Sequence, residues 1–393
     1  MVFRFVIGRR VTGFPILVTL VNLIRAIGRR VGDEILRRAT GAEGLLLLSV
    51  KDRLRERLTY VWLEPMQYFA ARRRLSEMPP ISPYPGRGRR RSVVDRYWSS
   101  HTVGFKSAIM SEAESLEYLD FFQSYAPLKH KLCGLYDKHS GETLLDYGCG
   151  PGNDLVGWAL KSDAARIIGA DISRRALHMA RRRLALHHDV DPTRLTFQEL
   201  SDVDPVLPFE DASIDYIHCL GVIHHVSNPL RTLEEFWRIL RPGGKGRLMA
   251  YNAESIYVNL NIAYGWQILG NEFPNKAADE AFEMMADLGA PIALCRSPEY
   301  WVELCEQAGF RTAFLGAYYS VAETKAWEEI STQAIDDERL QSHHREFLKK
   351  VRLNAEGYPV IDGRPAGLSA VYMLEKPVAP CSGSSFRLRR PGN

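Results

Sequence analysis

Three glycines on alternate positions follow an apolar run in the sequence Leu144-Leu145-Asp146-Tyr147-Gly148-Cys149-Gly150-Pro151-Gly152. Because Gly148, Gly150 and Gly152 have no Cβ, the backbone there can turn with positive φ and come close to a bound molecule. A change from apolar residues to glycines is typical of a β-strand that ends at a ligand. Cys149 is expected to be a small residue within this glycine loop and not a nucleophile.

A carboxylate on a second strand narrows the class of ligand. The run Ile167-Ile168-Gly169-Ala170-Asp171 ends in an acid nineteen residues after Gly152, and an acid at this point of a nucleotide-binding fold accepts hydrogen bonds from ribose hydroxyls. A dinucleotide site needs Gly-x-Gly-x-x-Gly, but here the third glycine comes one position early and Asn153 stands in its place. The pattern therefore disfavours a nicotinamide or flavin dinucleotide.

Helices and strands alternate from about residue 93 onward. Strands are predicted near 143–147, 166–170, 194–198, 214–219, 245–251, after Gly309-Phe310 and at 370–374. The alternation indicates a parallel sheet covered by helices on both faces. An aromatic-rich insertion at about 253–307 follows a strand at the ligand-binding edge, so it is expected to cover the substrate. A second insertion is expected at about 323–365.

Four further motifs follow the glycine loop and Asp171. They are Leu207-Pro208-Phe209-Glu210-Asp211-Ala212-Ser213-Ile214-Asp215, Gly221-Val222-Ile223-His224-His225, Leu240-Arg241-Pro242-Gly243-Gly244 and Ala308-Gly309-Phe310. In this order, over about residues 93 to 376, the motifs resemble those of class I S-adenosylmethionine-dependent methyltransferases of the small-molecule group. The resemblance implies an α/β, Rossmann-like, doubly wound sheet of seven strands, the last antiparallel.

The resemblance also implies S-adenosyl-L-methionine as the cofactor. Asp171 would receive the ribose, Ile172 would pack on adenine, and Asp146 would orient the methionine amino group or organise the glycine loop. Asp202 resembles the acid that accepts from the adenine amino group, but the spacing is one residue longer than usual and Asp204 could serve instead. The expected cofactor-binding residues are Asp146, Gly148, Cys149, Gly150, Gly152, Asp171, Ile172, Asp202, Val203 and Leu220.

A hydroxyl acceptor has a pKa far above neutrality, so its methylation benefits from a general base such as histidine. His225 and His224 follow the fourth strand and are the expected catalytic residues, although a structural role for either stays open. Tyr97 and Trp98 precede the first helix of the catalytic domain, where they would wall the pocket near the sulfonium or pack in the core. The expected substrate contacts are Tyr97, Trp98, His101, Tyr251 and Asp287.

The composition excludes several classes of protein. The 393 residues, 46% hydrophobic and 25% charged, are ordinary for a soluble globular chain, and six cysteines without Cys-x-x-Cys spacing suit the cytoplasm. His187-His188 and His343-His344 lack further ligands at metal-site spacing, so they are expected at surface helix positions and no metal is expected. The Asn/Asp-Pro-Pro-Tyr/Phe tetrapeptide, which binds the exocyclic amino group of a nucleic-acid base, is replaced after the fourth strand by Gly221-Val222-Ile223-His224. No nucleic-acid partner is therefore expected.

The first 91 residues are strongly basic, with 19 Arg or Lys against 7 Asp or Glu. Apolar residues recur at helical spacing from Leu47 to Trp62, which predicts that residues 1–78 form a basic amphipathic helical extension. Such an extension would lie on a membrane surface or pack on the catalytic domain. The arginine bias would also arise by translation upstream of a true start at Met78.

A Pro/Arg linker is predicted over residues 79–92, the methyltransferase domain over 93–378 and a flexible basic tail over 379–393. The expected function is S-adenosylmethionine-dependent O-methylation of a small molecule or of a lipid-linked sugar or secondary metabolite. The expected place is the cytoplasm, with peripheral membrane contact as an option. The alternatives are a membrane-associated C-methyltransferase of quinone or lipid type, and a non-catalytic S-adenosylmethionine-binding module.

Overall fold

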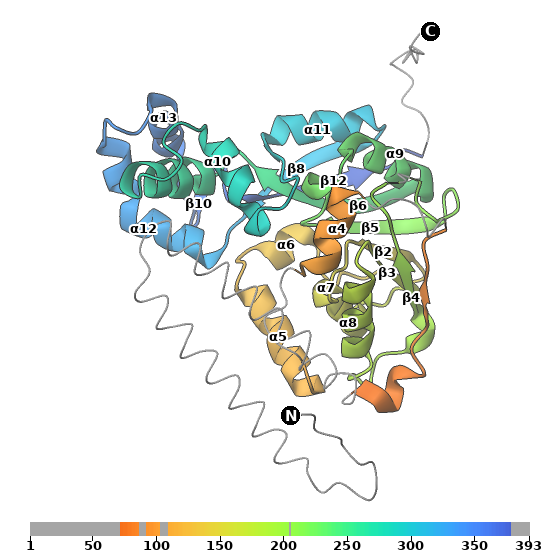
Figure 1. Cartoon of the computed structure of the whole chain (residues 1–393). Coiled ribbons are helices and arrows are strands. Elements are labelled where there is room, and N and C mark those ends of the chain that lie inside the picture. Colours follow the sequence, from red (N-terminus) through yellow and green to blue (C-terminus); the bar gives the residue numbers. More distant parts are fainter. Residues whose placement is uncertain (1–70, 86–91, 103–108, 204–205, 379–393) are drawn as a thin grey trace, which may run out of the picture. The chain divides into compact units, whose positions relative to one another are not determined.

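The computed structural model describes residues 71–85, 92–102, 109–203 and 206–378, whose arrangement Figure 1 shows. The chain divides into two compact units, Met1–Trp62 and Leu63–Asn393, and every described residue belongs to the second. Most of the predicted amphipathic extension, the arginine run of the linker and the basic tail lie outside the described residues. None of the helices in the described ranges combines the length and apolar character that a bilayer crossing needs.

One sheet of nine strands forms the centre of the described part, in the order β1-β4-β3-β2-β5-β6-β12-β8, with β7 beside β6. Strands β2 to β6 pair in parallel, whereas β12 runs antiparallel to both β6 and β8. The predicted doubly wound sheet with an antiparallel last strand is confirmed. The seven main strands are β2 (Thr143–Tyr147), β3 (Arg166–Asp171), β4 (Leu195–Glu199), β5 (Ile214–Leu220), β6 (Leu240–Asn252), β8 (Arg311–Tyr318) and β12 (Ser369–Glu375).

Helices cover both faces of this sheet. Consecutive strand residues point to opposite faces, and both sets of side chains are apolar and buried. Leu144 packs in one apolar cluster with Trp158, and Leu145 packs in another with Phe236 and Trp301. The helices of the first face are α5 (Glu112–Ser124), α6 (Lys129–Cys133), α7 (Asn153–Lys161) and α8 (Arg174–Leu184), and those of the second are α9 (Pro229–Ile239) and α11 (Pro298–Gln307). Short 3₁₀ turns, η2 (Pro192–Arg194) and η3 (Ile223–His225), complete the connections.

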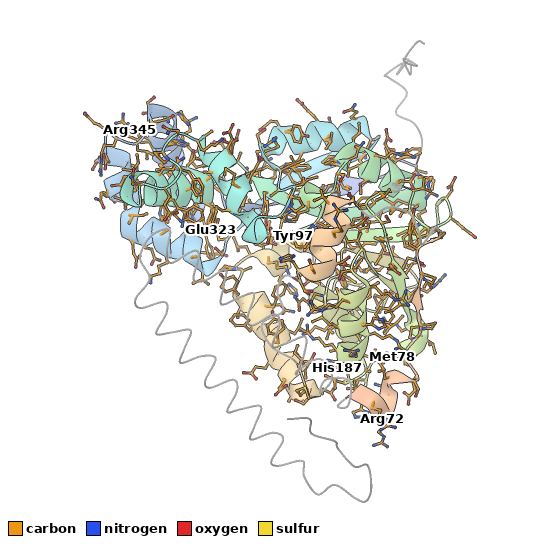
Figure 2. The ribbon with its side chains drawn as sticks, viewed as in Figure 1. Arg72, Met78, Tyr97, His187, Glu323 and Arg345 are labelled. Atoms are coloured by element: carbon orange, nitrogen blue, oxygen red, sulfur yellow. The ribbon has the colours of Figure 1, made fainter. Side chains whose placement is uncertain are left out.

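The described part of the predicted linker is a packed edge of the sheet. Strand β1 (Ile81–Ser82) pairs in parallel with β4, and Ile81 lies opposite Phe197. The Arg181 guanidinium fixes the preceding segment by donating to the carbonyls of Leu75, Met78 and Pro79 at 2.9, 2.8 and 2.7 Å. Met78 belongs to this segment (Figure 2), and it is only 2% exposed. Residues 79–85 of the linker predicted over 79–92 therefore pack along the edge of the sheet.

The two predicted insertions fold against each other, and we call them together the cover. They share one apolar cluster that includes Tyr264, Phe282 and Leu348. The elements of the cover are the π-helical segment η4 (Tyr257–Leu269), α10 (Ala278–Met285), η5 (Ala286–Leu288), α12 (Val321–Asp336), α13 (Ser342–Lys350) and the small sheet of β9 (Arg352–Leu353), β10 (Pro359–Ile361) and β11 (Arg364–Pro365). The short strand β7 (Cys295–Arg296) lies late in the first insertion and pairs in parallel with β6. Helix α11, expected within that insertion, instead packs on the main sheet through Trp301 and Cys305.

The predicted surface positions of two histidines are wrong. His187 is buried and its Nε2 lies 2.8 Å from Ser115 Oγ, while His344 is buried with Nδ1 2.7 Å from Asn259 Oδ1. Each ring finds a polar partner inside the protein, which offsets the free energy that its burial costs. Among the described residues, no group of His, Cys, Asp or Glu is arranged to hold a metal ion.

A glycine in helix α7 allows this helix to pack closely against the side chain of Tyr136. Alanine in a helix interior is ordinarily about 1 kcal/mol more favourable than glycine. At Gly157, however, a Cβ would lie 2.1 Å from Cζ of the buried Tyr136 ring. We therefore expect Gly157→Ala to lower the free energy of unfolding by about 1–3 kcal/mol, measured by urea denaturation. In a Tyr136→Ala background the same change should be neutral or stabilising, and equal losses in both backgrounds would contradict this packing.

Candidate active site

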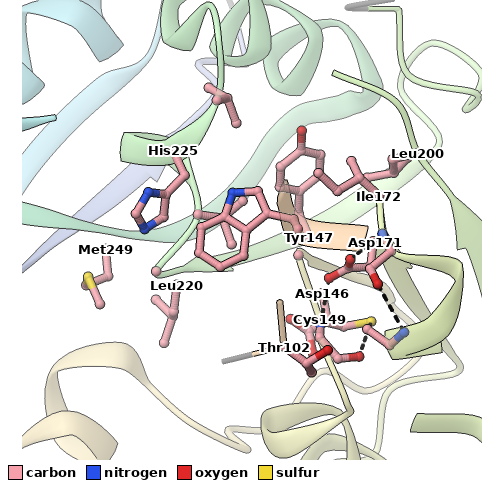
Figure 3. Close-up of a pocket in the computed structure, with 18 of the residues that line it drawn as sticks. Thr102, Asp146, Tyr147, Cys149, Asp171, Ile172, Leu200, Leu220, His225 and Met249 are labelled. Atoms are coloured by element: carbon pink, nitrogen blue, oxygen red, sulfur yellow. Dashed lines mark hydrogen bonds between the residues drawn. The ribbon is translucent and has the colours of Figure 1, made fainter. Parts of the chain in front are cut away.

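A cavity of about 330 Å³ lies where the main parallel strands end, and Figure 3 shows part of its wall. In open α/β sheets this carboxyl-end edge is where ligands bind. The volume falls in the range of small-molecule sites, about 300–1,000 Å³. The wall is formed by the glycine loop after β2, the end of β3, the segments after β4 and β5, and helix α4 (Val93–Ser100).

The glycine loop presents bare backbone to this cavity. Gly148 and Gly150 have φ values of 75° and 53°, and a Cβ placed on Gly150 would meet no atom within 4 Å. The amides of Gly148 and Cys149 both donate to the carbonyl of Ala170, at 2.7 and 3.1 Å. The loop is therefore fastened to β3, while its far side stays open to a ligand.

Two other members of the predicted loop have different surroundings. A Cβ on Gly152 would lie 3.0 Å from that of Ala180, so this glycine allows α7 and α8 to pack closely and does not line the cavity. Cys149 lines the cavity, but burial raises the pKa of its thiol well above the ordinary value. The un-ionised thiol fits the prediction of a small filling residue.

Asp171 ends β3 and holds the glycine loop with its carboxylate. One oxygen accepts from the amide of Gly150 at 2.8 Å, and the other accepts from the amide of Ser173 at 2.7 Å. Burial raises the pKa of Asp171 to about 6, against the lowering effect of these two bonds. Each carboxylate oxygen has a further acceptor position, and both Asp171 and Ile172 line the cavity as predicted.

The predicted adenine contact Asp202 is held by protein donors. It lines the cavity, and its carboxylate accepts from the Ser227 amide at 2.8 Å, from the Ser227 hydroxyl, and from the Ser92 hydroxyl at 3.0 Å. Val203 is 42% exposed and is not part of the wall. Asp204, the alternative to Asp202, lies outside the described residues.

A buried charged cluster occupies the wall beside Asp146. Asp146 is 4% exposed, its Oδ2 has no hydrogen-bond partner among the described residues, and burial and the neighbouring Asp154 raise its pKa. Lys129 is also 4% exposed, and its Nζ lies 3.0 and 3.1 Å from the two carboxylate oxygens of Asp154. All three side chains line the cavity. Sequence reasoning missed Lys129 and Asp154, because a single lysine in a short helix carries no motif.

The opposite wall holds a histidine and an acid. His225 lines the cavity, its Nδ1 lies 2.6 Å from the carbonyl of Ile292, and its Nε2 lies 3.0 Å from Oδ2 of Asp287. The hydroxyl of Tyr251 donates to the same Asp287 oxygen at 2.5 Å. Burial raises the pKa of Asp287, but the hydrogen bonds from His225 and Tyr251 outweigh it and leave that pKa below its ordinary value.

His224 is sealed away from the cavity. It is fully buried, neither ring nitrogen has a partner among the described residues, and its ring lies 3.8 Å from that of Tyr251. Burial lowers the pKa of His224 well below its ordinary value, so the ring is neutral. Of the two predicted bases, only His225 reaches the cavity.

Helix α4 closes the cavity between these walls. Trp98 and His101 line it, and the Trp98 ring lies 4.8 Å from the His225 ring. Tyr97 does not line the cavity; its hydroxyl donates to the backbone carbonyl of Asp287, which joins α4 to the cover (Figure 2). Leu220, predicted as a cofactor contact, also lies on the wall (Figure 3).

A family model and curated relatives match parts of this chain. Residues 145–245 match the family model described as "Methyltransferase domain". An uncharacterized 37.1 kDa protein in transposon TN4556 of Streptomyces fradiae is 32% identical over 199 residues, 47% of this chain and 55% of that protein. The 27-O-demethylrifamycin SV methyltransferase of Amycolatopsis mediterranei is 33% identical over 118 residues, 30% of this chain and 42% of that enzyme. The chain thus spans about half the length, or less, of these relatives.

Two solved structures match this chain at low sequence identity and low TM-score. A putative methyltransferase of Haloferax volcanii, solved with its Trm112 activator, has a TM-score of 0.42 and 20% identity, covering 74% of this chain and all of its own. A S-adenosylmethionine-dependent methyltransferase from Mesorhizobium loti has a TM-score of 0.41 and 16% identity, covering 63% of this chain and 97% of its own.

The residues of the cavity fit S-adenosylmethionine. The bare backbone at Gly150 leaves room for the ligand, Asp171 offers acceptors to a ribose diol, and the unpartnered oxygen of Asp146 suits an ammonium group. The cofactor predicted from the sequence is therefore confirmed as S-adenosyl-L-methionine. Residues 145–245 match a methyltransferase domain, and the chain around them is similar to class I S-adenosylmethionine-dependent methyltransferases.

Proposed function

We propose that this protein transfers the methyl group of S-adenosylmethionine to a weakly acidic hydroxyl, of phenol or enol type, on a small flat molecule. The observation that carries the proposal is the Asp287 carboxylate, which lines the cavity and is held at one oxygen by His225 and Tyr251. When bound, S-adenosylmethionine supplies a methyl group that its sulfonium already makes electrophilic. The protein then has to align the acceptor and take its proton.

The hydrogen-bond pattern favours Asp287 over His225 as the group that accepts the proton. Both nitrogens of His225 lie within hydrogen-bond distance of protein acceptor atoms, the Ile292 carbonyl and the Asp287 carboxylate, so neither is left free for an acceptor hydroxyl. The contacts of Asp287 from His225 and Tyr251 fall on Oδ2, and Oδ1 has no hydrogen-bond partner among the described residues. An acceptor hydroxyl would donate to Oδ1 and lose its proton to this carboxylate as the methyl group arrives.

The strength of this base selects the kind of hydroxyl. The pKa of Asp287 lies below its ordinary value, so the carboxylate is a weak base. Proton transfer to it is less unfavourable from a phenol, with a pKa of about 10, than from an alcohol or sugar hydroxyl. Aromatic and apolar side chains of Trp98, Tyr251 and Met249 line the same region and suit a flat ring.

Several relatives that match parts of this chain are named as O-methyltransferases or for a demethylated substrate. Besides the rifamycin enzyme, a ubiquinone biosynthesis O-methyltransferase of Idiomarina loihiensis is 30% identical over 117 residues. The direct test incubates the protein with labelled S-adenosylmethionine and sets of phenols, quinols and sugars. Label transferred to sugars but not to phenols or quinols would contradict the proposed acceptor.

A C-methyltransferase is the second candidate. A demethylmenaquinone methyltransferase of Clavibacter sepedonicus is 34% identical over 106 residues. Deprotonation of a quinol hydroxyl by Asp287 would also activate its ring carbon, so the same site suits both reactions. Product NMR distinguishes a new O-methyl from a new C-methyl group.

Two further proposals concern the rest of the chain. The basic segment before the domain would bring the protein to anionic lipid, which suits a lipid-linked acceptor. Flotation with anionic vesicles, with and without residues 1–62, checks this, and equal recovery of both forms would contradict it.

A non-catalytic binding module is the other alternative, and binding of the cofactor without turnover of any acceptor would favour it.

Asp171 makes cofactor affinity depend on pH. The ribose diol donates to the ionised carboxylate, so lowering the pH through about 6 protonates Asp171 and removes these acceptors. We expect affinity for S-adenosylhomocysteine, measured by calorimetry, to fall between pH 7 and pH 5. Asp171→Asn should weaken binding at pH 7 by about 1.5–3 kcal/mol and flatten this part of the profile. An Asp171→Asn profile as steep as that of the wild type would assign the pH dependence to another group.

Neighbouring histidines provide a matched pair of variants for the proton-accepting site. We expect Asp287→Asn and His225→Phe to lower the methyl-transfer rate about 10²–10⁴-fold while cofactor affinity is retained. His224→Phe should retain most activity, because His224 does not line the cavity and its ring makes no hydrogen bond to a described residue. Full activity of Asp287→Asn, or equal losses in the two histidine variants, would remove this assignment.

A further inference from the structure

Lys129 is an unusual member of the cavity wall. Lysine is almost never buried unless it is paired, and here Nζ is paired with Asp154 and lies 4.0 Å from the centroid of the Phe122 ring. An ammonium group has three N–H donors. The two contacts to Asp154 use two of them, and the third has no acceptor among the described residues.

Complementary groups without partners lie at this end of the cavity. Asp146 has the unpartnered, buried oxygen described above, and the buried hydroxyl of Thr102 also has no partner among the described residues. Figure 3 shows Thr102 and Asp146 beside Cys149 of the glycine loop. Lys129 and Asp146 both line the cavity, and the charge of Lys129 partly counteracts the burial that raises the pKa of Asp146. This end therefore offers one acceptor for a cation and one donor for an anion.

An α-amino acid group carries this pair of charges. We infer that Lys129 binds the α-carboxylate of the cofactor's methionine moiety while Asp146 accepts from its α-ammonium, an inference that rests on the proposed function. Asp154 would then orient Lys129 and limit its net charge, with His218 Nε2 supporting Asp154 at 3.4 Å. Lys129 would be a residue that selects adenosyl amino acids over simple nucleosides. A purely structural role, in which Lys129 only joins α6 to α7 through Asp154, is the competing explanation.

Three nucleosides separate these explanations by calorimetry on the intact chain. S-adenosylhomocysteine has both charges, S-adenosyl-3-thiopropylamine lacks the carboxylate, and 5′-methylthioadenosine lacks the whole amino acid. We expect Lys129→Met to weaken S-adenosylhomocysteine about 10–100-fold, the range for a charge-assisted hydrogen bond, and to change the other two by less than about threefold. Lys129→Arg should restore part of the loss. Lys131→Met, at an exposed position of the same helix, is the matched control and should change none of them.

The outcomes are distinguishable. If Lys129→Met weakens all three nucleosides alike, or leaves S-adenosylhomocysteine unchanged, the inference is overturned in favour of the structural role. If that variant does not fold, the wild type still decides: S-adenosyl-3-thiopropylamine should bind at least about tenfold more weakly than S-adenosylhomocysteine, and equal affinities would overturn the inference. If the wild type binds none of the three, the proposed function itself fails.

Discussion

The site depends on the hydrogen bonds that the Asp171 carboxylate accepts from the backbone. Its two oxygens accept backbone hydrogens from Gly150 and Ser173, so one side chain joins the loop after β2 to the end of β3. The Ala170 carbonyl adds two more bonds to the glycine loop. The fastened loop has positive φ at Gly148 and Gly150, a conformation that favours glycine, and it buries a carboxylate at a cost in free energy. A ligand that donates to Asp171 offsets that cost, which couples the shape of the loop to ligand binding.

The remaining walls come from distant parts of the chain and are joined by polar contacts. The buried Asp95 of α4 accepts from the Asp202 amide at 3.0 Å, and Asp202 in turn accepts from Ser92 and Ser227. On the other side, Tyr97 donates to the carbonyl of Asp287 in the cover. Asp287 has φ 48° and ψ 45°, a left-handed conformation that is uncommon outside glycine and is often found at functional sites. Helix α4 and its N-cap thus contact both the segment after β4 and the cover.

Features with a local signal could be predicted from the sequence. The strands, the glycine loop and Asp171 were predictable because an apolar run, missing side chains and a terminal acid lie within a few residues of each other. The choice between His224 and His225 was not, because it depends on Ile292 and Asp287 of the cover.

Features that arise from long-range contacts could not be predicted. Lys129 and Asp154 are 25 residues apart and meet only when α6 packs beside α7. Proline-rich sequence concealed β1, since a two-residue strand such as Ile81–Ser82 has no periodicity to detect. A crystal structure with S-adenosylhomocysteine tests the central claim most directly. The account predicts the ribose hydroxyls on Asp171 and the homocysteine backbone along Gly148 and Gly150; a ligand bound elsewhere, or with its ribose away from Asp171, would contradict it.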